Sequence, residues 1–124
     1  MIVVTVIAII SAIAYPSYTQ YVVRGKRSEG RTALLDSAAK LERYYSDNSA
    51  YSNADNDFPP LTNFSTSSET GKYNLTIATA GTRQTFVLTA TPTFVDPDCA
   101  NFTYTQAGTR NVTGTASVAT CWGR

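Results

Sequence analysis

The longest apolar stretch of the chain is its first one, which runs from Met1 to Val23. Thirteen of the first fifteen residues are apolar, and no charged residue occurs before Arg24. A helix over this charge-free run is ~34 Å long, enough to cross the ~30 Å hydrocarbon core of a bilayer. The run lacks the basic start and the small-residue cleavage site of a secretory signal. We expect residues 1–23 to form a hydrophobic helical half that lies in lipid or in a dry helical bundle.

Small side chains and a proline mark the middle of this stretch. Ala8, Ser11 and Ala12 are spaced three and four residues apart, a pattern that lets helices approach closely in apolar surroundings. Pro16 lacks an amide hydrogen and its ring clashes with the carbonyl group of Ala12, so we expect a kink or a local opening between these two residues. A membrane anchor with a proline kink and a helix used for assembly both fit these features.

The next segment, residues 24–48, has the pattern of an amphipathic helix. Gly25 and Gly30 each weaken a helix by up to ~1 kcal/mol, so we interpret them as a flexible joint between the two helical halves. One helix over both halves would be ~70 Å long, so its first half must protrude from the globular remainder, which we call the head. The apolar stripe expected to pack on the head has spacings of four, three and four residues and consists of Leu34, Ala38, Leu41 and Tyr45.

The remaining chain has the pattern of a connection followed by antiparallel strands. Residues 49–71 are polar and rich in turn residues around one apolar knot, Phe58–Leu61, and we expect them to form a surface connection. Residues 72–124 should form the sheet and a region bounded by two cysteines. The expected fold is α+β, a long helix packed on a four-stranded antiparallel meander. The predicted strands are residues 72–79, 84–91, 102–106 and 111–118.

Two cysteines, Cys99 and Cys121, lie near the end of the chain. A bridge between them would close a loop of about twenty residues and typically stabilises a fold by ~3 kcal/mol. An even number of cysteines on an exported chain suggests a disulfide, and two buried thiols are the alternative.

A basic cluster follows the apolar run, and it predicts a different compartment from the one that a disulfide requires. It contains Arg24, Lys26, Arg27 and Arg31. The positive-inside rule would keep these residues in the cytoplasm, whereas a disulfide requires an oxidising compartment. We give the disulfide more weight.

Composition excludes several classes of function. The chain has no histidine, no metal-ligand spacing of cysteines and no glycine-rich phosphate loop, so we expect no enzyme, metal or cofactor. The acidic pairs in 55–57 and 96–98 lack the further ligands of a calcium loop and have the composition of turns. From Asp47 onward, four basic residues face six acidic ones, a net charge of −2 that disfavours a phosphate-binding surface.

One repeat keeps DNA open as a partner. The tetrapeptide AGTR occurs at residues 80–83 and again at 107–110. Because the first and third turns of a meander lie at the same end of the sheet, Arg83 and Arg110 could share an edge and contact DNA. Shared turn chemistry explains the repeat as well.

Several stretches carry a family resemblance, namely MIVV at 1–4, IAII at 7–10, AIAYPSY at 12–18, KRSE at 26–29 and LERYY at 41–45, followed by Cys99 and by Cys121 with Trp122. These stretches resemble a type IV pilin, most of all the PilE-like pilins of Gram-negative bacteria. The resemblance is continuous up to Tyr45 and is limited to architecture and cysteine placement beyond it.

The resemblance implies a processed N-terminus. Pilins of this kind carry a short basic leader cut by a prepilin peptidase, an N-methylated first residue and a glutamate that sets the register of subunits. The motif that bears these features, a Phe-Thr-Leu-Ile-Glu-Leu run before the methionine that matches Met1, is absent from the sequence. We therefore expect the natural protein to have further residues that precede Met1.

The resemblance also implies a filament. The precursor would wait in the bacterial inner membrane with its head in the periplasm, until the pilus assembly machinery extracts it into an extracellular filament of identical copies, used for adhesion, twitching motility and DNA uptake. In the filament the helix would open between about Ile9 and Pro16, around Ala12 and Ala14. The residues expected to pack the filament core are Ile2, Val3, Val6, Ile7, Ala8, Ile10, Ser11, Ala12 and Ile13.

Two other functions fit the same residues. The first alternative is a minor pilin that initiates or caps the fibre or captures DNA. A type II secretion pseudopilin is a further alternative, although the late cysteine pair and Trp122 are more similar to a pilus subunit.

Overall fold

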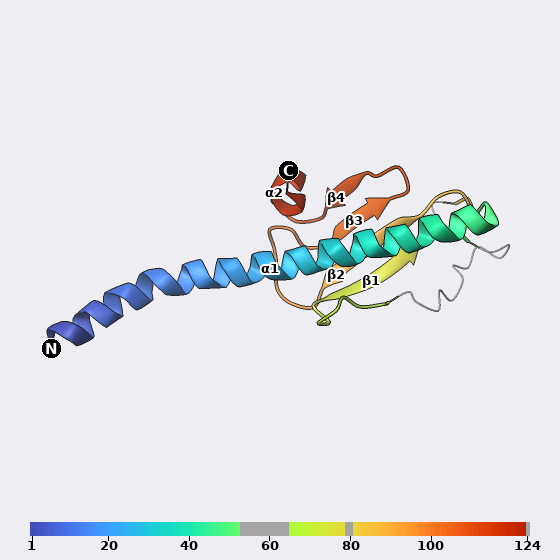
Figure 1. Ribbon diagram of the computed structural model, residues 1–124. Coiled ribbons are helices and arrows are strands. Elements are labelled where there is room, and N and C mark those ends of the chain that lie inside the picture. The colour runs from blue at the N-terminus through green and yellow to red at the C-terminus, as the bar shows by residue number, and fades with distance from the viewer. Residues whose placement is uncertain (53–64, 79–80, 124) are drawn as a thin grey trace.

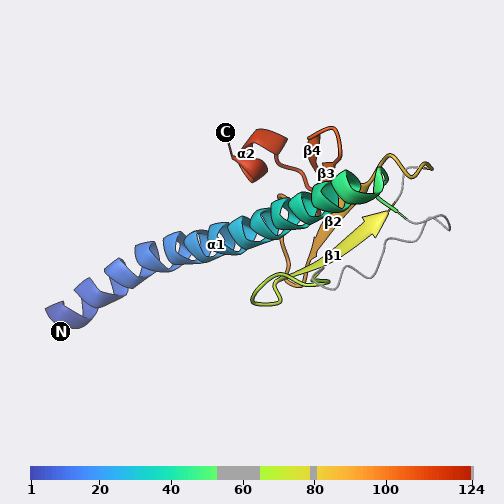
Figure 2. The same cartoon turned by 45° about the vertical axis from the view of Figure 1, so that its right-hand side comes forward.

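A computed structural model describes residues 1–52, 65–78 and 81–123. One long helix, α1, packs its second half on a four-stranded antiparallel sheet, and its first half projects away from the head (Figures 1 and 2). This arrangement confirms the predicted α+β fold. The elements are α1 (Ile2–Asn48), β1 (Tyr73–Ala78), β2 (Val87–Pro92), β3 (Phe102–Thr105), β4 (Arg110–Val112) and α2 (Val118–Trp122).

The helix α1 is helical throughout its 47 residues, including Pro16. The interruption predicted between Ala12 and Pro16 is therefore not seen in the single subunit, where the projecting half is gently curved instead (Figure 1). A proline removes only one backbone donor, and a helix can accommodate its ring by bending. Opening of the helix within a filament stays a prediction.

The second half of α1 lies across β1, β2 and β3. Leu34 and Leu41 are fully buried and Ala38 is nearly so, while Tyr45 is half-buried. These side chains pack in the core with large residues of the sheet, among them Phe86, Leu88 and Phe102. The stripe with spacings of four and three residues thus lies on the sheet.

The flexibility predicted at Gly25 and Gly30 stays a prediction, but Gly30 also has a packing role that the sequence did not indicate. The helix continues through both positions, and Gly30 is buried against the ring of Tyr73. Glycine is used at position 30 because the helix and strand β1 approach closely there, which leaves no room for a side chain.

The strand order is β1-β2-β3-β4 and every neighbouring pair is antiparallel, as predicted. The connection between α1 and β1 is described at residues 49–52 and 65–72, and its second part folds back on β1 through a bridge between Ser67 and Asn74. Its first part differs from the predicted surface position, because the ring of Tyr51 is buried in the core. The apolar knot at 58–61 lies outside the described residues.

The last predicted strand, 111–118, differs from the structure. Strand β4 ends at Val112, and the short helix α2 begins at Val118. A Cβ atom on Gly114 would clash with the carbonyl oxygen of Asp98, so the backbone passes the β2–β3 loop more closely than a residue with a side chain allows. Ser117 then caps α2 by accepting a hydrogen bond from the amide of Thr120.

Candidate assembly helix, disulfide region and arginine turns

The projecting half of α1 presents its apolar side chains to the surroundings. Ile2 is 81% exposed and Ile13 is 71% exposed. An 18-residue window of this helix is apolar enough to cross a membrane, and none of it is buried in the subunit. The other residues predicted for the filament core are exposed as well, namely Val3, Val6, Ile7, Ala8, Ile10, Ser11 and Ala12.

Three hydroxyl side chains of this half bond to their own helix. The hydroxyl of Thr5 donates to the carbonyl oxygen of Met1 at 3.2 Å, and that of Ser11 donates to the carbonyl oxygen of Ile7 at 2.8 Å. The hydroxyl of Thr19 donates to the carbonyl oxygen of Pro16 at 2.9 Å. Because these three donors are satisfied internally, they can enter lipid or a helical bundle without being left unpaired.

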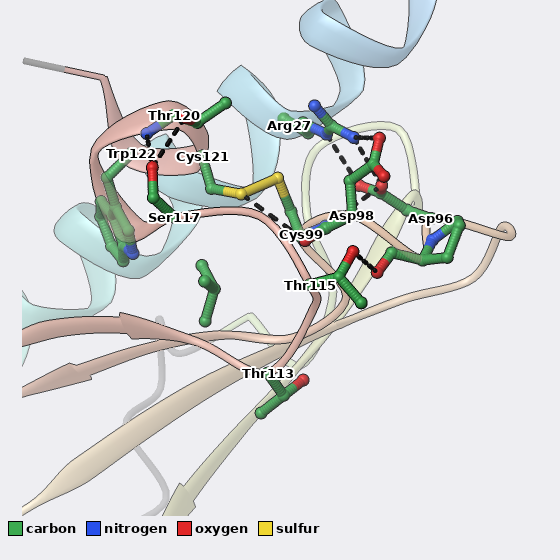
Figure 3. The surroundings of a disulfide bond; sticks show 12 residues. Arg27, Asp96, Asp98, Cys99, Thr113, Thr115, Ser117, Thr120, Cys121 and Trp122 are labelled. Atoms are coloured by element: carbon green, nitrogen blue, oxygen red, sulfur yellow. Dashed lines mark hydrogen bonds and ion pairs between the residues drawn. A yellow bond between two sulfur atoms is a disulfide. The ribbon is translucent and has the colours of Figure 1, made fainter.

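Near the other end of the chain, Cys99 and Cys121 form a disulfide with a Cα–Cα distance of 5.7 Å, which confirms the predicted bridge (Figure 3). Both cysteines are buried. Trp122 packs edge-on against Phe102 with ring centroids 5.5 Å apart, and its indole N–H donates to the carbonyl oxygen of Asn111 at 3.0 Å. The bridge therefore joins α2 to the β2–β3 loop, and Trp122 packs α2 on the sheet.

Lys26, Arg27 and Arg31 of the basic cluster of α1 are bound within the subunit, which the sequence did not reveal. The guanidinium of Arg27 donates two hydrogen bonds to Asp96, of 2.8 Å from Nε and 2.6 Å from Nη2, and reaches Asp98 at 3.4 Å (Figure 3). The Asp96 side chain is only 1% exposed. The hydrogen bonds from Arg27 hold the pKa of the Asp96 carboxyl below its ordinary value, although burial acts in the opposite direction.

The neighbours of Arg27 on α1 contact the same loop and two other segments. The ammonium of Lys26 lies 4.7 Å from the centroid of the Phe94 ring. The carboxylate of Glu29 accepts hydrogen bonds from the amide and hydroxyl of Thr70, at 2.8 and 2.7 Å. Nη1 of Arg31 donates to the carbonyl oxygen of Trp122 at 2.6 Å. The cluster thus binds α1 to the β2–β3 loop, the segment before β1 and the C-terminal helix.

The described part of the first repeat, residues 81–83, and the second repeat, residues 107–110, lie at the end of the sheet where α1 ends (Figure 1). Arg83 is exposed, and its Nε donates to the carbonyl oxygen of Ser52 at 3.1 Å. Arg110 is also exposed, and its guanidinium carbon lies 5.4 Å from the Trp122 ring centroid. Both arginines are therefore oriented by neighbours within the subunit, and each keeps an accessible charge.

These features can be compared with known proteins. A family model described as "Type IV minor pilin ComP, DNA uptake sequence receptor" matches residues 16–103. The chain belongs to this family of type IV pilins. A search of curated proteins found no match.

The solved structures agree with the pilin fold. A type IV pilin from Shewanella oneidensis is 28% identical, with a TM-score of 0.55, and the match covers 82% of this chain and 98% of that one. The family resemblance carried by the N-terminal motifs is therefore confirmed. The projecting half of α1, the disulfide and the arginine turns of this pilin belong to different elements of the fold.

Proposed function

We propose that this pilin is a structural subunit of a type IV pilus. The observation that carries the proposal is the projecting half of α1, which is apolar, exposed and internally hydrogen-bonded from Ile2 to Ile13. Burying so much apolar surface is favourable by ~25 cal/mol per Å², in a bilayer or in a bundle of like helices. The subunit is held in the inner membrane first and polymerises afterwards, with its head outside the cytoplasm, where the disulfide is stable.

Assembly uses heterologous contacts that do not close on themselves, since these generate helical filaments. Ala8, Ser11 and Ala12 let neighbouring helices approach closely, and the other apolar residues fill the filament core. Pro16, with the unpaired carbonyl that it leaves near Ala12, allows the helix to open in the filament. Prepilin peptidase and the pilus assembly machinery are the partners of this route. The subunit itself carries out no catalysis.

Mass spectrometry of filaments sheared from the source cells tests this proposal. Peptides of this head should dominate the filament protein, together with an N-methylated peptide from the mature N-terminus. If filaments lack this chain while secretion of folded proteins depends on it, the pseudopilin alternative replaces the proposal. A rare presence in the filament assigns the chain to the minor pilins.

DNA capture by a minor pilin is the second candidate function, and the matched family favours it because its description names a DNA uptake sequence receptor. The negative net charge of the head is weaker evidence against DNA binding than the composition suggested, because two of its acidic residues lie far from the two arginines. Asp96 and Asp98 lie beside Arg27 in the β2–β3 loop, at the opposite end of the sheet from Arg83 and Arg110. Exposed arginines at one end can contact successive phosphates.

Duplex binding by the detergent-solubilised chain at increasing salt tests this second function. The variant Arg83→Ala/Arg110→Ala should bind more weakly, and the slope of log affinity against log salt should fall by about 2 if each arginine neutralises one phosphate. Lys72→Ala at the opposite end of the sheet is the matched control. Arg110→Lys keeps the charge while changing the contact with Trp122, so it separates electrostatics from packing. Unchanged affinity in the double variant removes DNA capture by these turns.

A further inference from the structure

A groove of about 570 Å³ lies where α1 leaves the head, between α1 and the β2–β3 loop. We call it the basal groove. Arg24, Arg27 and Arg31 line it from α1, and their spacing of three and four residues places them on one helix face. Asp96 and Asp98 line the opposite wall. Three cations thus face two carboxylates, which leaves the groove positively charged.

The three arginines differ in the hydrogen bonds and ion pairs that they make within the subunit. Arg27 is paired with Asp96 and approaches Asp98, and Arg31 donates one hydrogen bond to Trp122. Arg24 is exposed and makes no hydrogen bond or ion pair with any residue in the described ranges 1–52, 65–78 and 81–123. Its guanidinium is therefore the group that can bind an anion from outside.

The groove lies at the level where the apolar helix ends. Val23, the last residue of the charge-free run, is part of its lining. Three exposed tyrosines precede it on α1, namely Tyr15, Tyr18 and Tyr21. Tyrosine is enriched at membrane–water interfaces. On the other wall Val95 is 91% exposed, a large apolar side chain at the tip of a polar loop.

We propose that the basal groove binds the headgroup of an anionic phospholipid while the subunit is held in the membrane. Arg24 donates to the lipid phosphate, because a guanidinium offers paired donors that match phosphate oxygens. Val95 enters the interfacial layer beside it, so the head has a second contact with the bilayer besides α1. This inference rests on the membrane-held state proposed above.

Tryptophan reporters in the full chain, reconstituted in vesicles, test the inference. Every sample has the same content of phosphatidylglycerol and phosphatidylcholine, and bromine atoms that quench tryptophan are placed on one lipid or on the other. The reporter is Val95→Trp, read as the difference from the unchanged chain with its native Trp122. Ala107→Trp, in the β3–β4 turn at the far end of the sheet, is the control for position. Ile10→Trp, quenched by bromine near the bilayer centre, reports whether α1 is inserted.

The expected result is stronger quenching of the position-95 reporter by brominated phosphatidylglycerol than by brominated phosphatidylcholine. A basic residue near an anionic surface changes association about fivefold. Adding Arg24→Gln should therefore remove the preference for phosphatidylglycerol, while Arg43→Gln, an exposed arginine farther along α1, should keep it. Thermal melting of the Arg24→Gln chain should be unchanged, since Arg24 bonds to no described residue.

The outcomes separate the two proposals. If the position-10 reporter is not quenched, the membrane-held state itself is wrong. If it is quenched but the position-95 reporter is quenched no more than the position-107 control, the bilayer contact of the head is wrong. Equal quenching by the two labelled lipids, or a preference that survives Arg24→Gln, overturns the headgroup site.

Discussion

Tyr73 lies so close to Gly30 that a Cβ atom at position 30 would stand 2.8 Å from Cδ2 of its ring. The ring is fully buried between α1 and the sheet, in edge-on contact with Phe94 and Phe102. Burial also raises the pKa of the Tyr73 hydroxyl, so the side chain stays neutral in the core. The closeness of α1 and β1 therefore depends on the missing side chain at position 30.

We predict that Gly30→Ala destabilises the head even though alanine favours helix. Alanine gains ~1 kcal/mol of helix propensity, but the clash with a rigid buried ring costs about 1–3 kcal/mol. Denaturation of the full chain in detergent, followed by the fluorescence of Trp122, measures the net loss. Gly25→Ala is the matched control, because nothing lies within 4 Å of a Cβ there and the propensity gain should appear as stabilisation. A Gly30→Ala chain as stable as the Gly25→Ala chain would contradict the close packing.

The ion pair of Arg27 and Asp96 predicts a pH dependence of stability. The pKa of Asp96 is lowered in the folded chain, so its contribution is fully present above the unfolded pKa of about 3.9. The contribution is lost as the pH falls through the lower folded pKa. The free energy of unfolding should therefore decrease in acid more steeply for the natural chain than for Asp96→Asn.

At neutral pH, Asp96→Asn should cost about 3 kcal/mol, since Arg27 then remains partly buried without its main partner. Asp98→Asn is the control, because the Asp98 side chain is 64% exposed and an exposed pair contributes at most about 1 kcal/mol. An equal loss of unfolding free energy in the two variants would show that burial of the Asp96 pair does not add to stability.

The disulfide predicts sensitivity to reduction. Cys99→Ser should lower the free energy of unfolding by ~2–4 kcal/mol in oxidising buffer, because the bridge closes a loop of 22 residues in the unfolded chain. Adding a reductant should destabilise the natural chain and leave the variant Cys99→Ser/Cys121→Ser unchanged. If the reductant leaves the melting curve of the natural chain unchanged, the bridge contributes nothing to stability.

Helix packing in the filament predicts a defect that spares the head. Ala8→Leu/Ser11→Leu enlarges the small-residue face, so neighbouring helices cannot approach and fewer pili should form. Head melting should not change, because both positions are exposed in the subunit. Ser17→Leu is the control, because this exposed position lies about 170° around the helix from this face and outside the segment expected to open. Pilus counts by electron microscopy test this prediction. A normal number of pili in the double variant would show that these residues are not needed for the close approach of helices.

The sequence predicted those parts of the fold that depend on local pattern. Apolar spacing indicated the helix and three of the strands closely, because burial of one face imposes a fixed period on the residues. The disulfide followed from the cysteine number together with the apolar helix. The fourth strand was predicted too long, since the backbone of Gly114 is constrained by Asp98, a residue distant in sequence.

The basic cluster shows why the remainder was not predicted. Its residues were interpreted as a signal of membrane topology, whereas Arg27 binds Asp96 across 69 residues and Arg31 binds Trp122 across 91. No local period marks such pairs. The packing role of Gly30 was not predicted for the same reason, because helix propensity alone does not reveal a ring from another element. The roles of the filament-core residues and of Arg83 and Arg110 stay predictions, since they concern partners outside the subunit.

The contacts of Arg27 and Arg31 also define how the subunit carries mechanical load. When α1 is pulled toward the filament axis, Arg27 transmits tension to Asp96 and Arg31 transmits it to Trp122. These two attachment points lie just before Cys99 and just after Cys121, so the disulfide joins them covalently. In a filament, part of the tension on α1 would therefore enter a cross-linked loop, besides the load that the helix passes to the sheet through its buried stripe.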